Sequence, residues 1–308
     1  MENKIAILGA GLVGTSWATI FFQAGYNVLI FDCDEKKLRL GISNVTKNLV
    51  DLKKYGLVSE QSNQTGKIDI TTSLSDALQG AFYAQESIYE DLETKTNFYL
   101  EIDSVIDSNT IVGSSTSTLV ASAFTENNRC SARCLVVHPA NPPHLIPIVE
   151  IVPKPSTPKD VCYRVKNLMS KIGMEPIVLS HEIDGFILNR LQGALLNEAF
   201  YLFENGFASA DDIDKTISKG LGLRWALMGP FETIDLNAPD GISDYCIRYS
   251  ELYFNMMKQS DPSIPWNQNT IEKLSDAMRS KYASGDIKNR QAIRDHRLAA
   301  LKAYLINE

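Results

Sequence analysis

Residues 4–14 read Lys4-Ile5-Ala6-Ile7-Leu8-Gly9-Ala10-Gly11-Leu12-Val13-Gly14, a short apolar run that leads into three closely spaced glycines. The apolar run predicts a buried strand, the glycines a tight turn, and the amphipathic segment after them a helix. Gly9 permits the turn, Gly11 allows close approach to a pyrophosphate, and Gly14 lets the helix pack on the strand. We expect the N–H groups at the start of this helix, where Leu12 and Val13 lie, to face the phosphates of a dinucleotide.

A second apolar run, residues 27–31, follows at the spacing of a βαβ unit and ends in Asp32. A carboxylate at this place can accept hydrogen bonds from the adenosine ribose hydroxyls. It also repels a 2′-phosphate, and the next residues, Cys33, Asp34 and Glu35, include no arginine to hold one. The sequence therefore predicts NAD as the cofactor in preference to NADP.

The composition is that of an ordinary globular protein, because 44% of the 308 residues are hydrophobic and 22% are charged. This length suits two domains. A net charge of −7 disfavours a nucleic-acid partner, which needs a basic surface. No apolar run reaches membrane-spanning length. The five cysteines lack the spacing of a disulfide framework or a zinc site, so we expect free thiols, no metal and a cytoplasmic location.

The order of the apolar runs predicts the domain organisation. After the first βαβ unit, residues 34–56 show helical spacing and form an unusually long crossover, which we interpret as a helical arm. Short apolar runs then recur at 68–71, 81–87, 110–113, 135–138, 148–152 and 175–179. They predict an α/β fold with a doubly wound, Rossmann-type sheet in residues 1–182. From 183 to 308 the apolar residues recur every three or four positions, which predicts a smaller all-helical domain.

Candidate site residues lie where strands are expected to end, because ligands of a doubly wound sheet bind beyond the carboxyl ends of its strands. A cluster of hydroxyls occupies residues 114–118, and His138 ends the run 135–138. Histidine exchanges protons near neutral pH. Glu150 lies within an apolar run and needs solvent or a partner. If neighbouring strands bring it to His138, it would select the imidazole tautomer and stabilise the imidazolium.

Each of these residues also has a purely structural interpretation. The hydroxyl cluster is compatible with a turn and a helix cap, and His138 with a structural histidine. A fourth candidate, Asn189, lies between apolar residues near the start of a long helix. A buried amide needs a partner, which a capping or interhelical role would also provide.

Several segments carry a resemblance to the 3-hydroxyacyl-CoA dehydrogenase superfamily. They are the glycine loop, Ser114-Ser115-Thr116-Ser117-Thr118, His138-Pro139-Ala140-Asn141-Pro142-Pro143, Val149-Glu150-Ile151-Val152, and Glu182-Ile183-Asp184-Gly185-Phe186 with Asn189-Arg190. Within the superfamily, the chain most resembles the lambda-crystallin branch, that of L-gulonate 3-dehydrogenase, over nearly its whole length. The double proline 142–143 and the segments 220–226 and 229–233 carry this finer resemblance.

The resemblance implies roles for individual residues. His138 would be the general base and Glu150 its orienting partner, while Ser117 and Asn189 would donate hydrogen bonds to the substrate oxygen. Asn141 belongs to the same turn as the histidine and is a further candidate for substrate binding.

The resemblance also implies positions near the cofactor and the substrate carboxylate. Glu90 and Lys95 match family positions near the nicotinamide-side ribose, and Ser115 stands where acyl-CoA relatives carry an asparagine in contact with the cofactor. We nominate Arg224 to hold a substrate carboxylate, because a guanidinium pairs with a carboxylate through two parallel hydrogen bonds. Arg224 would act across a dimer interface if the helical domains of two copies pair, as they do in the superfamily.

The resulting hypothesis is an NAD-dependent oxidoreductase that transfers hydride from the 3-hydroxyl of a small hydroxy acid, with L-gulonate as the model substrate. A 3-hydroxyacyl-CoA is an alternative, for which Lys47, Lys53 and Lys54 offer cations to the CoA phosphates. Carnitine is another alternative substrate. A different class is a non-catalytic, crystallin-like NAD-binding protein, which would have no use for a proton acceptor. The related β-hydroxyacid dehydrogenases use a lysine, and the helix around Asn189 offers none.

Overall fold

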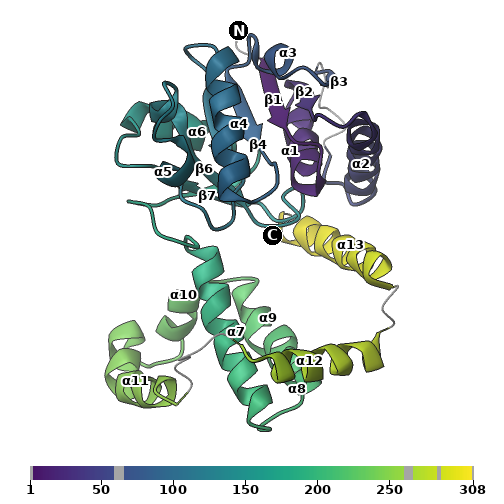
Figure 1. The fold of residues 1–308 in the computed structure, drawn as a ribbon. Helices are drawn as coiled ribbons and strands as arrows, with labels where there is room; N and C mark the ends of the chain where they lie inside the picture. The colour runs from purple at the N-terminus through teal and green to yellow at the C-terminus, as the bar shows by residue number, and fades with distance from the viewer. Residues whose placement is uncertain (1–2, 59–65, 260–265, 283–285, 307–308) are drawn as a thin grey trace. The chain divides into compact units, whose positions relative to one another are not determined.

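The computed structural model describes residues 3–58, 66–259, 266–282 and 286–306. They form two compact units, drawn in Figure 1. The first unit contains the residues up to 189 together with those from 289 onward, and the second contains residues 190–288.

An eight-stranded sheet forms the centre of the first unit, with strand order β3-β2-β1-β4-β5-β6-β7-β8. The strands are β1 (Lys4–Leu8), β2 (Asn27–Phe31), β3 (Ile68–Thr71), β4 (Tyr83–Glu86), β5 (Ile111–Ser114), β6 (Cys134–Pro139), β7 (Ile148–Val152) and β8 (Glu175–Val178). All neighbouring pairs are parallel except β6 and β7, which are antiparallel. The predicted doubly wound sheet is confirmed, with one reversal that the sequence analysis did not predict.

Helices cover both faces of the sheet, as the alternation of side chains along β1 requires. Ile5 and Ile7 belong to a core with α1 (Leu12–Gln23) and α6 (Lys159–Lys171). Ala6 and Leu8 belong to the opposite core, to which α3, α4 and α5 contribute. These three helices span Leu74–Leu78, Leu92–Val105 and Ser122–Thr125, and a 3₁₀ turn, η1, spans Ser131–Arg133.

The long helix predicted after Asp34 is α2 (Glu35–Lys54), and Asp34 caps it by accepting a hydrogen bond from the Lys36 amide. Its buried residues include Leu38 and Val45, at helical spacing. A side chain at Gly41 would lie 3.3 Å from Thr15, so α2 packs closely against α1. The predicted helical arm therefore lies against the helix that follows the glycine loop.

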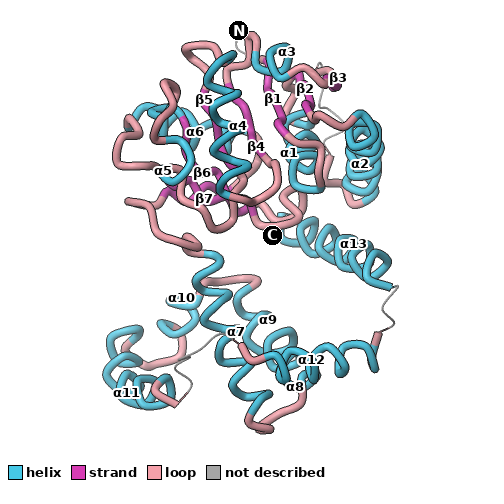
Figure 2. The backbone as a smooth tube through the Cα atoms, in the orientation of Figure 1, coloured by secondary structure: helices cyan, strands magenta, loops and turns pink. Residues whose placement is uncertain are grey.

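Helices and loops alone make up the described part of the second unit, as Figure 2 shows. The elements are α7 (Leu188–Glu204), α8 (Ala210–Thr216), the π-helical turn η2 (Ile217–Leu221), α9 (Gly222–Trp225), α10 (Pro230–Asp235), α11 (Gly241–Met257) and α12 (Gln268–Lys281). The first two residues of α7 group with the first unit. The prediction of an all-helical segment after the sheet is confirmed.

The last helix, α13 (Ile287–Ile306), groups with the sheet-containing unit from residue 289 onward. Ala299 joins Leu52 and Leu145 in a small core, and the Lys302 ammonium donates to the carbonyl of His144. This grouping differs from the predicted division, which placed all of 183–308 in the helical domain. The apolar spacing of a helix shows which of its faces is buried, but not which unit it packs on.

Candidate active site

The glycine loop after β1 has room for a ligand and little room for side chains. Gly9 has a φ of +112°, and a Cβ atom there would lie 2.6 Å from the carbonyl oxygen of Ser87. A Cβ atom on Gly14 would lie 2.0 Å from the Gly9 carbonyl oxygen. A Cβ atom on Gly11 would meet nothing within 4 Å. Gly9 and Gly14 are thus needed by the fold itself, whereas Gly11 borders open space.

Asp32 is held beside this loop at the end of β2. One of its carboxylate oxygens accepts from the Ala10 amide at 3.0 Å and the other from the Asp34 amide at 3.1 Å. Gly11, the residue before α1, offers no side chain to cap the amides of the first helical turn, and Leu12 is exposed. An uncapped helix start, open space at Gly11 and a nearby carboxylate fit the diphosphate and the adenosine ribose of NAD.

His138 and Glu150 are opposite each other in the antiparallel register of β6 and β7. His138 Nδ1 lies 2.7 Å from Glu150 Oε2, and both side chains are buried. The other carboxylate oxygen, Oε1, accepts from the amides of Ile187 and Leu188 at 2.7 and 3.0 Å. The start of α7 therefore orients the carboxylate, which in turn orients the imidazole.

The charge of Glu150 determines which ring nitrogen of His138 is free. Burial alone raises the pKa of Glu150, but the hydrogen bonds from His138, Leu188 and Ile187 outweigh it and lower that pKa below its ordinary value. An ionised carboxylate only accepts, so Nδ1 of His138 donates and Nε2 of the neutral ring carries the lone pair. The Phe186 ring, centred 5.4 Å from the imidazole, packs against it.

The hydroxyl cluster after β5 is organised by Glu90, which lies between β4 and α4. The carboxylate of Glu90 accepts from both the amide and the hydroxyl of Ser117 and of Thr118, and from the Thr116 hydroxyl. Burial opposes ionisation, but these bonds prevail and lower the pKa of Glu90 to about 2. Asn189 Nδ2 donates to the Ser117 carbonyl at 2.6 Å. Ser117, Asn189 and Glu90 are thus joined in one network.

The two predicted donors to the substrate oxygen, Ser117 and Asn189, already donate within the protein. The single hydroxyl hydrogen of Ser117 goes to Glu90, and one amide hydrogen of Asn189 goes to the Ser117 carbonyl. As placed here, Ser117 Oγ can accept from a substrate hydroxyl, and Asn189 retains a second N–H to donate.

Lys95, which was predicted near the cofactor ribose, forms a buried ion pair. Its ammonium lies 2.7 and 2.9 Å from the two carboxylate oxygens of Glu86, and both residues are almost wholly excluded from solvent. Glu86 also accepts from the Ser114 hydroxyl and the Ile88 amide. Glu86 was not among the predicted residues, although an acid at the end of an apolar run was a visible signal.

The remaining predicted residues occupy different surroundings. The Ser115 hydroxyl takes part in a partly buried network with Trp17 and Gln85. Asn141 is exposed on the loop after β6. Arg224 lies on α9 in the second unit, where its guanidinium is exposed and its charge acts on Tyr245. The roles of these residues stay predictions.

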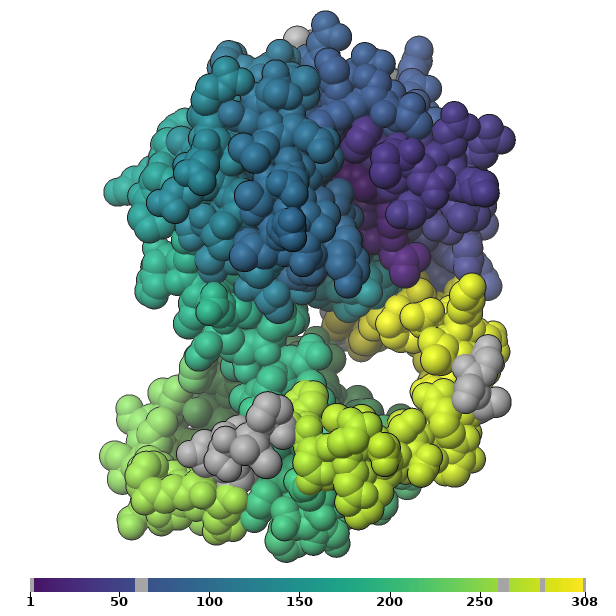
Figure 3. Space-filling model, viewed as in Figure 1, coloured from purple at the N-terminus to yellow at the C-terminus, as the bar shows by residue number. Residues whose placement is uncertain are grey.

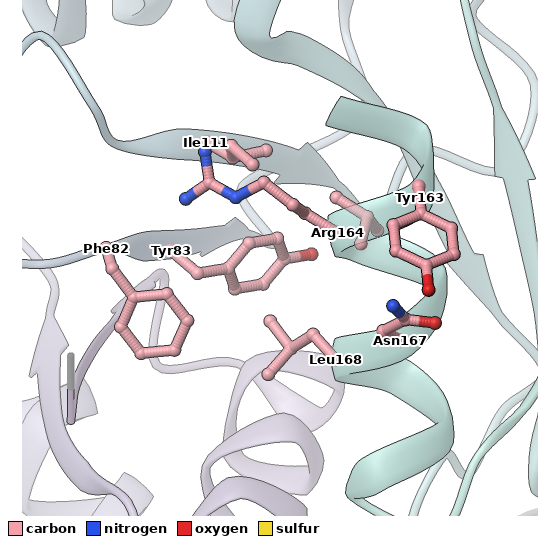
Figure 4. Close-up of a pocket in the computed structure, with 8 residues that line it drawn as sticks. Phe82, Tyr83, Ile111, Tyr163, Arg164, Asn167 and Leu168 are labelled. Carbon is pink, nitrogen blue, oxygen red and sulfur yellow. The ribbon is translucent and has the colours of Figure 1, made fainter. Parts of the chain in front are cut away.

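A separate pocket, shown in Figure 4, contains none of the predicted site residues. Its cavity volume is about 240 Å³, and it lies where β4 and β5 begin, beside α6. The residues that line it are Phe82, Tyr83, Ile111, Tyr163, Arg164, Val165, Asn167 and Leu168.

The described residues contain no group of three or more His, Cys, Asp or Glu side chains placed to hold a metal ion. Among the described helices, none combines the length and the apolar character needed to span a membrane.

Models of two domains of one protein family match this chain. Residues 4–183 match the NAD-binding domain of 3-hydroxyacyl-CoA dehydrogenase, and residues 185–286 match its C-terminal domain. Lambda-crystallin of Oryctolagus cuniculus is 38% identical over 97% of this chain and 94% of its own length. The L-carnitine dehydrogenase of Oceanobacillus iheyensis is 32% identical over 92% of this chain and 89% of its own length.

Two solved structures share the fold. The NAD⁺-dependent dismutase 5-formyl-3-hydroxy-2-methylpyridine 4-carboxylic acid 5-dehydrogenase has a TM-score of 0.87 and 27% identity, with 99% of each chain covered. The (S)-3-hydroxybutyryl-CoA dehydrogenase PaaH1 from Ralstonia eutropha has a TM-score of 0.66 and 25% identity, with 82% of this chain and 89% of that chain covered. With its NAD-binding domain in residues 4–183, this chain belongs to the 3-hydroxyacyl-CoA dehydrogenase family of NAD-dependent oxidoreductases, in the lambda-crystallin branch.

Proposed function

We propose that this protein oxidises the 3-hydroxyl of a small free hydroxy acid, with His138 as the general base. The observation that carries the proposal is the 2.7 Å hydrogen bond from His138 Nδ1 to Glu150, which leaves Nε2 as the basic nitrogen. The carbon-bound hydrogen leaves as hydride, for which bound NAD is the acceptor. Nε2 takes the hydroxyl proton, and the Glu150 carboxylate stabilises the resulting imidazolium.

The hydrogen bond to the substrate oxygen is assigned to Asn189, and Ser117 would join it only by turning its hydroxyl from Glu90 to the substrate. In the alcohol, the substrate hydroxyl hydrogen points to Nε2 of His138, and the oxygen accepts from the free N–H of Asn189. As the proton moves to His138, negative charge develops on this oxygen and strengthens that bond. Glu90 holds the Ser117 loop in place, which makes Glu90 a positioning residue for the substrate.

A free acid is favoured over a CoA thioester by the relatives. Among the solved structures that cover 99% of both chains, that of an enzyme named for a pyridine carboxylic acid has a TM-score of 0.87, whereas that of a 3-hydroxyacyl-CoA dehydrogenase from Archaeoglobus fulgidus has a TM-score of 0.66. We assign Arg224 to the substrate carboxylate, because its guanidinium is exposed and suits a bidentate pair.

A homodimer formed through the helical unit is part of this proposal. None of the residues of α11 is buried, and Ile247 and Phe254 expose most of their surfaces, as do Phe231 and Leu236 on or next to α10. In Figure 3, α11 is the light green part of the second unit's surface. So many exposed apolar side chains favour a protein partner, and a second copy is the simplest one. Light scattering across a dilution series tests the dimer.

The cytoplasmic location also stays a proposal. It rests on the five cysteines, whose spacing suits free thiols in a reducing compartment.

The test of the activity is NADH formation with L-gulonate, L-3-hydroxybutyrate, 3-hydroxybutyryl-CoA and carnitine in parallel. We expect turnover of a free hydroxy acid, and its loss in His138→Ala with the affinity for NAD retained. Turnover confined to the thioester, or to carnitine, would replace the substrate class but keep His138 as the base. NAD binding without turnover of any of the four would favour the non-catalytic alternative.

A further inference from the structure

A network of polar side chains crosses the interior of the first unit between the glycine loop and the strand that carries His138. We call it the Gln85 network, and its members are Trp17, Tyr83, Gln85, Ser87 and Ser115. Trp17 belongs to α1, Tyr83 and Gln85 belong to β4, and the two serines directly follow β4 and β5. Tyr83 also lines the pocket of Figure 4.

The orientation of the Gln85 amide is determined by its neighbours. Its Nε2 lies 3.2 Å from the backbone carbonyl oxygen of Val137, which can only accept. If the amide were turned over, two oxygens would face each other there. The amide oxygen therefore points to Tyr83, whose hydroxyl donates to it at 2.5 Å, and the second N–H of Nε2 points to Ser115 at 2.7 Å.

The direction of the Ser115 hydroxyl follows from this orientation. The Trp17 indole N–H, which can only donate, lies 3.1 Å from Ser115 Oγ, and Gln85 donates to the same oxygen. Ser115 thus accepts two hydrogen bonds, which uses both of its lone pairs. Its single hydrogen goes to the third neighbour, Ser87 Oγ, at 2.9 Å. The Ser115 hydroxyl is fully used inside the protein.

Ser87 is left with a hydrogen to donate. Its oxygen accepts from Ser115, and among the described residues it has no other hydrogen-bond partner. Ser87 is half-buried beside the glycine loop, because its carbonyl oxygen lies 2.6 Å from where a Cβ atom on Gly9 would be. Ser87 directly follows β4, which neighbours β1 in the sheet. The strand order changes direction between these two strands, and sheets of this kind bind dinucleotides at that point.

We propose that the Ser87 hydroxyl donates a hydrogen bond to an oxygen of the bound dinucleotide, in its central ribose–pyrophosphate part. Ser115, which was predicted to contact the cofactor, acts instead through Ser87, and Gln85 fixes the direction of both hydroxyls. Gln85 also donates to the backbone carbonyl of Val137, the residue before His138. The side-chain amide of Gln85 therefore orients the Ser87 hydroxyl toward the cofactor and also contacts the strand that carries His138.

The test is a titration of the whole protein with NADH, without substrate, followed by fluorescence or calorimetry. We expect Ser87→Ala to raise the dissociation constant about five- to tenfold, the usual effect of one hydrogen bond. Ser115→Ala should have a smaller effect, and Ser87→Ala/Ser115→Ala should match Ser87→Ala alone. Ser104→Ala, at an exposed position of α4, is the matched control and should bind as the unaltered protein does.

Two outcomes would overturn the proposal. One is an unchanged dissociation constant in Ser87→Ala. The other is an additive double variant, since additivity would mean that Ser115 reaches the cofactor independently. Circular dichroism and the melting midpoint of each variant show whether the fold is intact. Because the readout is cofactor binding, the result does not depend on the substrate assigned above.

Discussion

Glu150 Oε2 lies 2.7 Å from His138 Nδ1, while Glu150 Oε1 accepts from the amides of residues 187 and 188. The carboxylate is thus held from both sides, by a side chain of the sheet and by the start of a helix. Neither oxygen can exchange places with the other without breaking two backbone hydrogen bonds. The pair therefore has one arrangement of protons, with Nδ1 of the imidazole as a donor.

We expect Glu150→Gln to lower kcat by about 10²- to 10⁴-fold with little effect on NAD affinity. The glutamine oxygen should stay on the two amides, which need an acceptor, so its NH₂ group faces His138. Nδ1 must then accept, and the proton of the neutral ring moves to Nε2, where the base is needed. Steady-state rates and an NADH titration check this, and an unchanged kcat would contradict the role of Glu150 in setting the tautomer of His138.

The glycine loop offers a matched pair of substitutions. Gly14→Ala places a Cβ atom 2.0 Å from the Gly9 carbonyl, so we expect a loss of about 1–3 kcal/mol in the free energy of unfolding. Gly11→Ala meets nothing within 4 Å and should leave the unfolding free energy nearly unchanged. It should nevertheless weaken NAD binding, because its methyl group enters the space open to the diphosphate. Urea unfolding and NADH titration of both variants separate the two effects, and equal effects on stability would contradict this assignment.

Removal of one partner of the buried Glu86–Lys95 pair should destabilise the protein more than removal of both charges. Lys95→Met leaves a carboxylate without its cation in the interior, and we expect a loss of about 3–5 kcal/mol. The double variant Glu86→Gln/Lys95→Met should be more stable than Lys95→Met, since no buried charge is left. Lys215→Met, which breaks an exposed ion pair with Asp211, is the control and should change the free energy of unfolding far less than Lys95→Met does, because solvent screens the exposed charges. A double variant less stable than Lys95→Met would contradict this account.

Much of the sheet could be predicted because its strands are local apolar runs between turns. The reversal at β7 could have been predicted too. Fewer than ten residues separate the runs 135–138 and 148–152, and a parallel crossover needs a dozen or more. The antiparallel register is what places Glu150 opposite His138.

The contacts that sequence reasoning missed are not local. The amides of Ile187 and Leu188 reach Glu150 from 37 and 38 residues away, and no side chain signals a backbone donor. Lys95 matched a cofactor position by resemblance, yet it lies nine residues from Glu86, which takes its charge. Similarly, Ser115 is used by Trp17, 98 residues away. The hydrogen-bond acceptor that a polar side chain meets depends on how separate elements pack together. Hydrophobic periodicity carries no information about that packing.

Glu90 should make the protein less stable in acid. The pKa of its carboxyl is about 2 in the folded protein against an ordinary value of 4.5, so the folded state binds fewer protons than the unfolded state between these values. The stabilisation from ionised Glu90 is therefore fully present above about pH 4.5 and is lost as the pH falls toward 2. Protonation removes an acceptor site from the hydroxyls and amides of residues 116–118.

Glu90→Gln tests this directly, because its amide has one acceptor oxygen where the carboxylate has two. We expect the variant to be less stable than the unaltered protein at pH 7, and the difference to shrink as the pH is lowered from 4.5 toward 2. Urea unfolding at pH 7, 5, 4 and 3 measures the difference. Asp212→Asn, on the surface of the helical unit, serves as the control for a general change in charge. If the Glu90→Gln difference were the same at every pH, the carboxylate would contribute by its shape alone and its charge would have no part in holding the Ser117 loop.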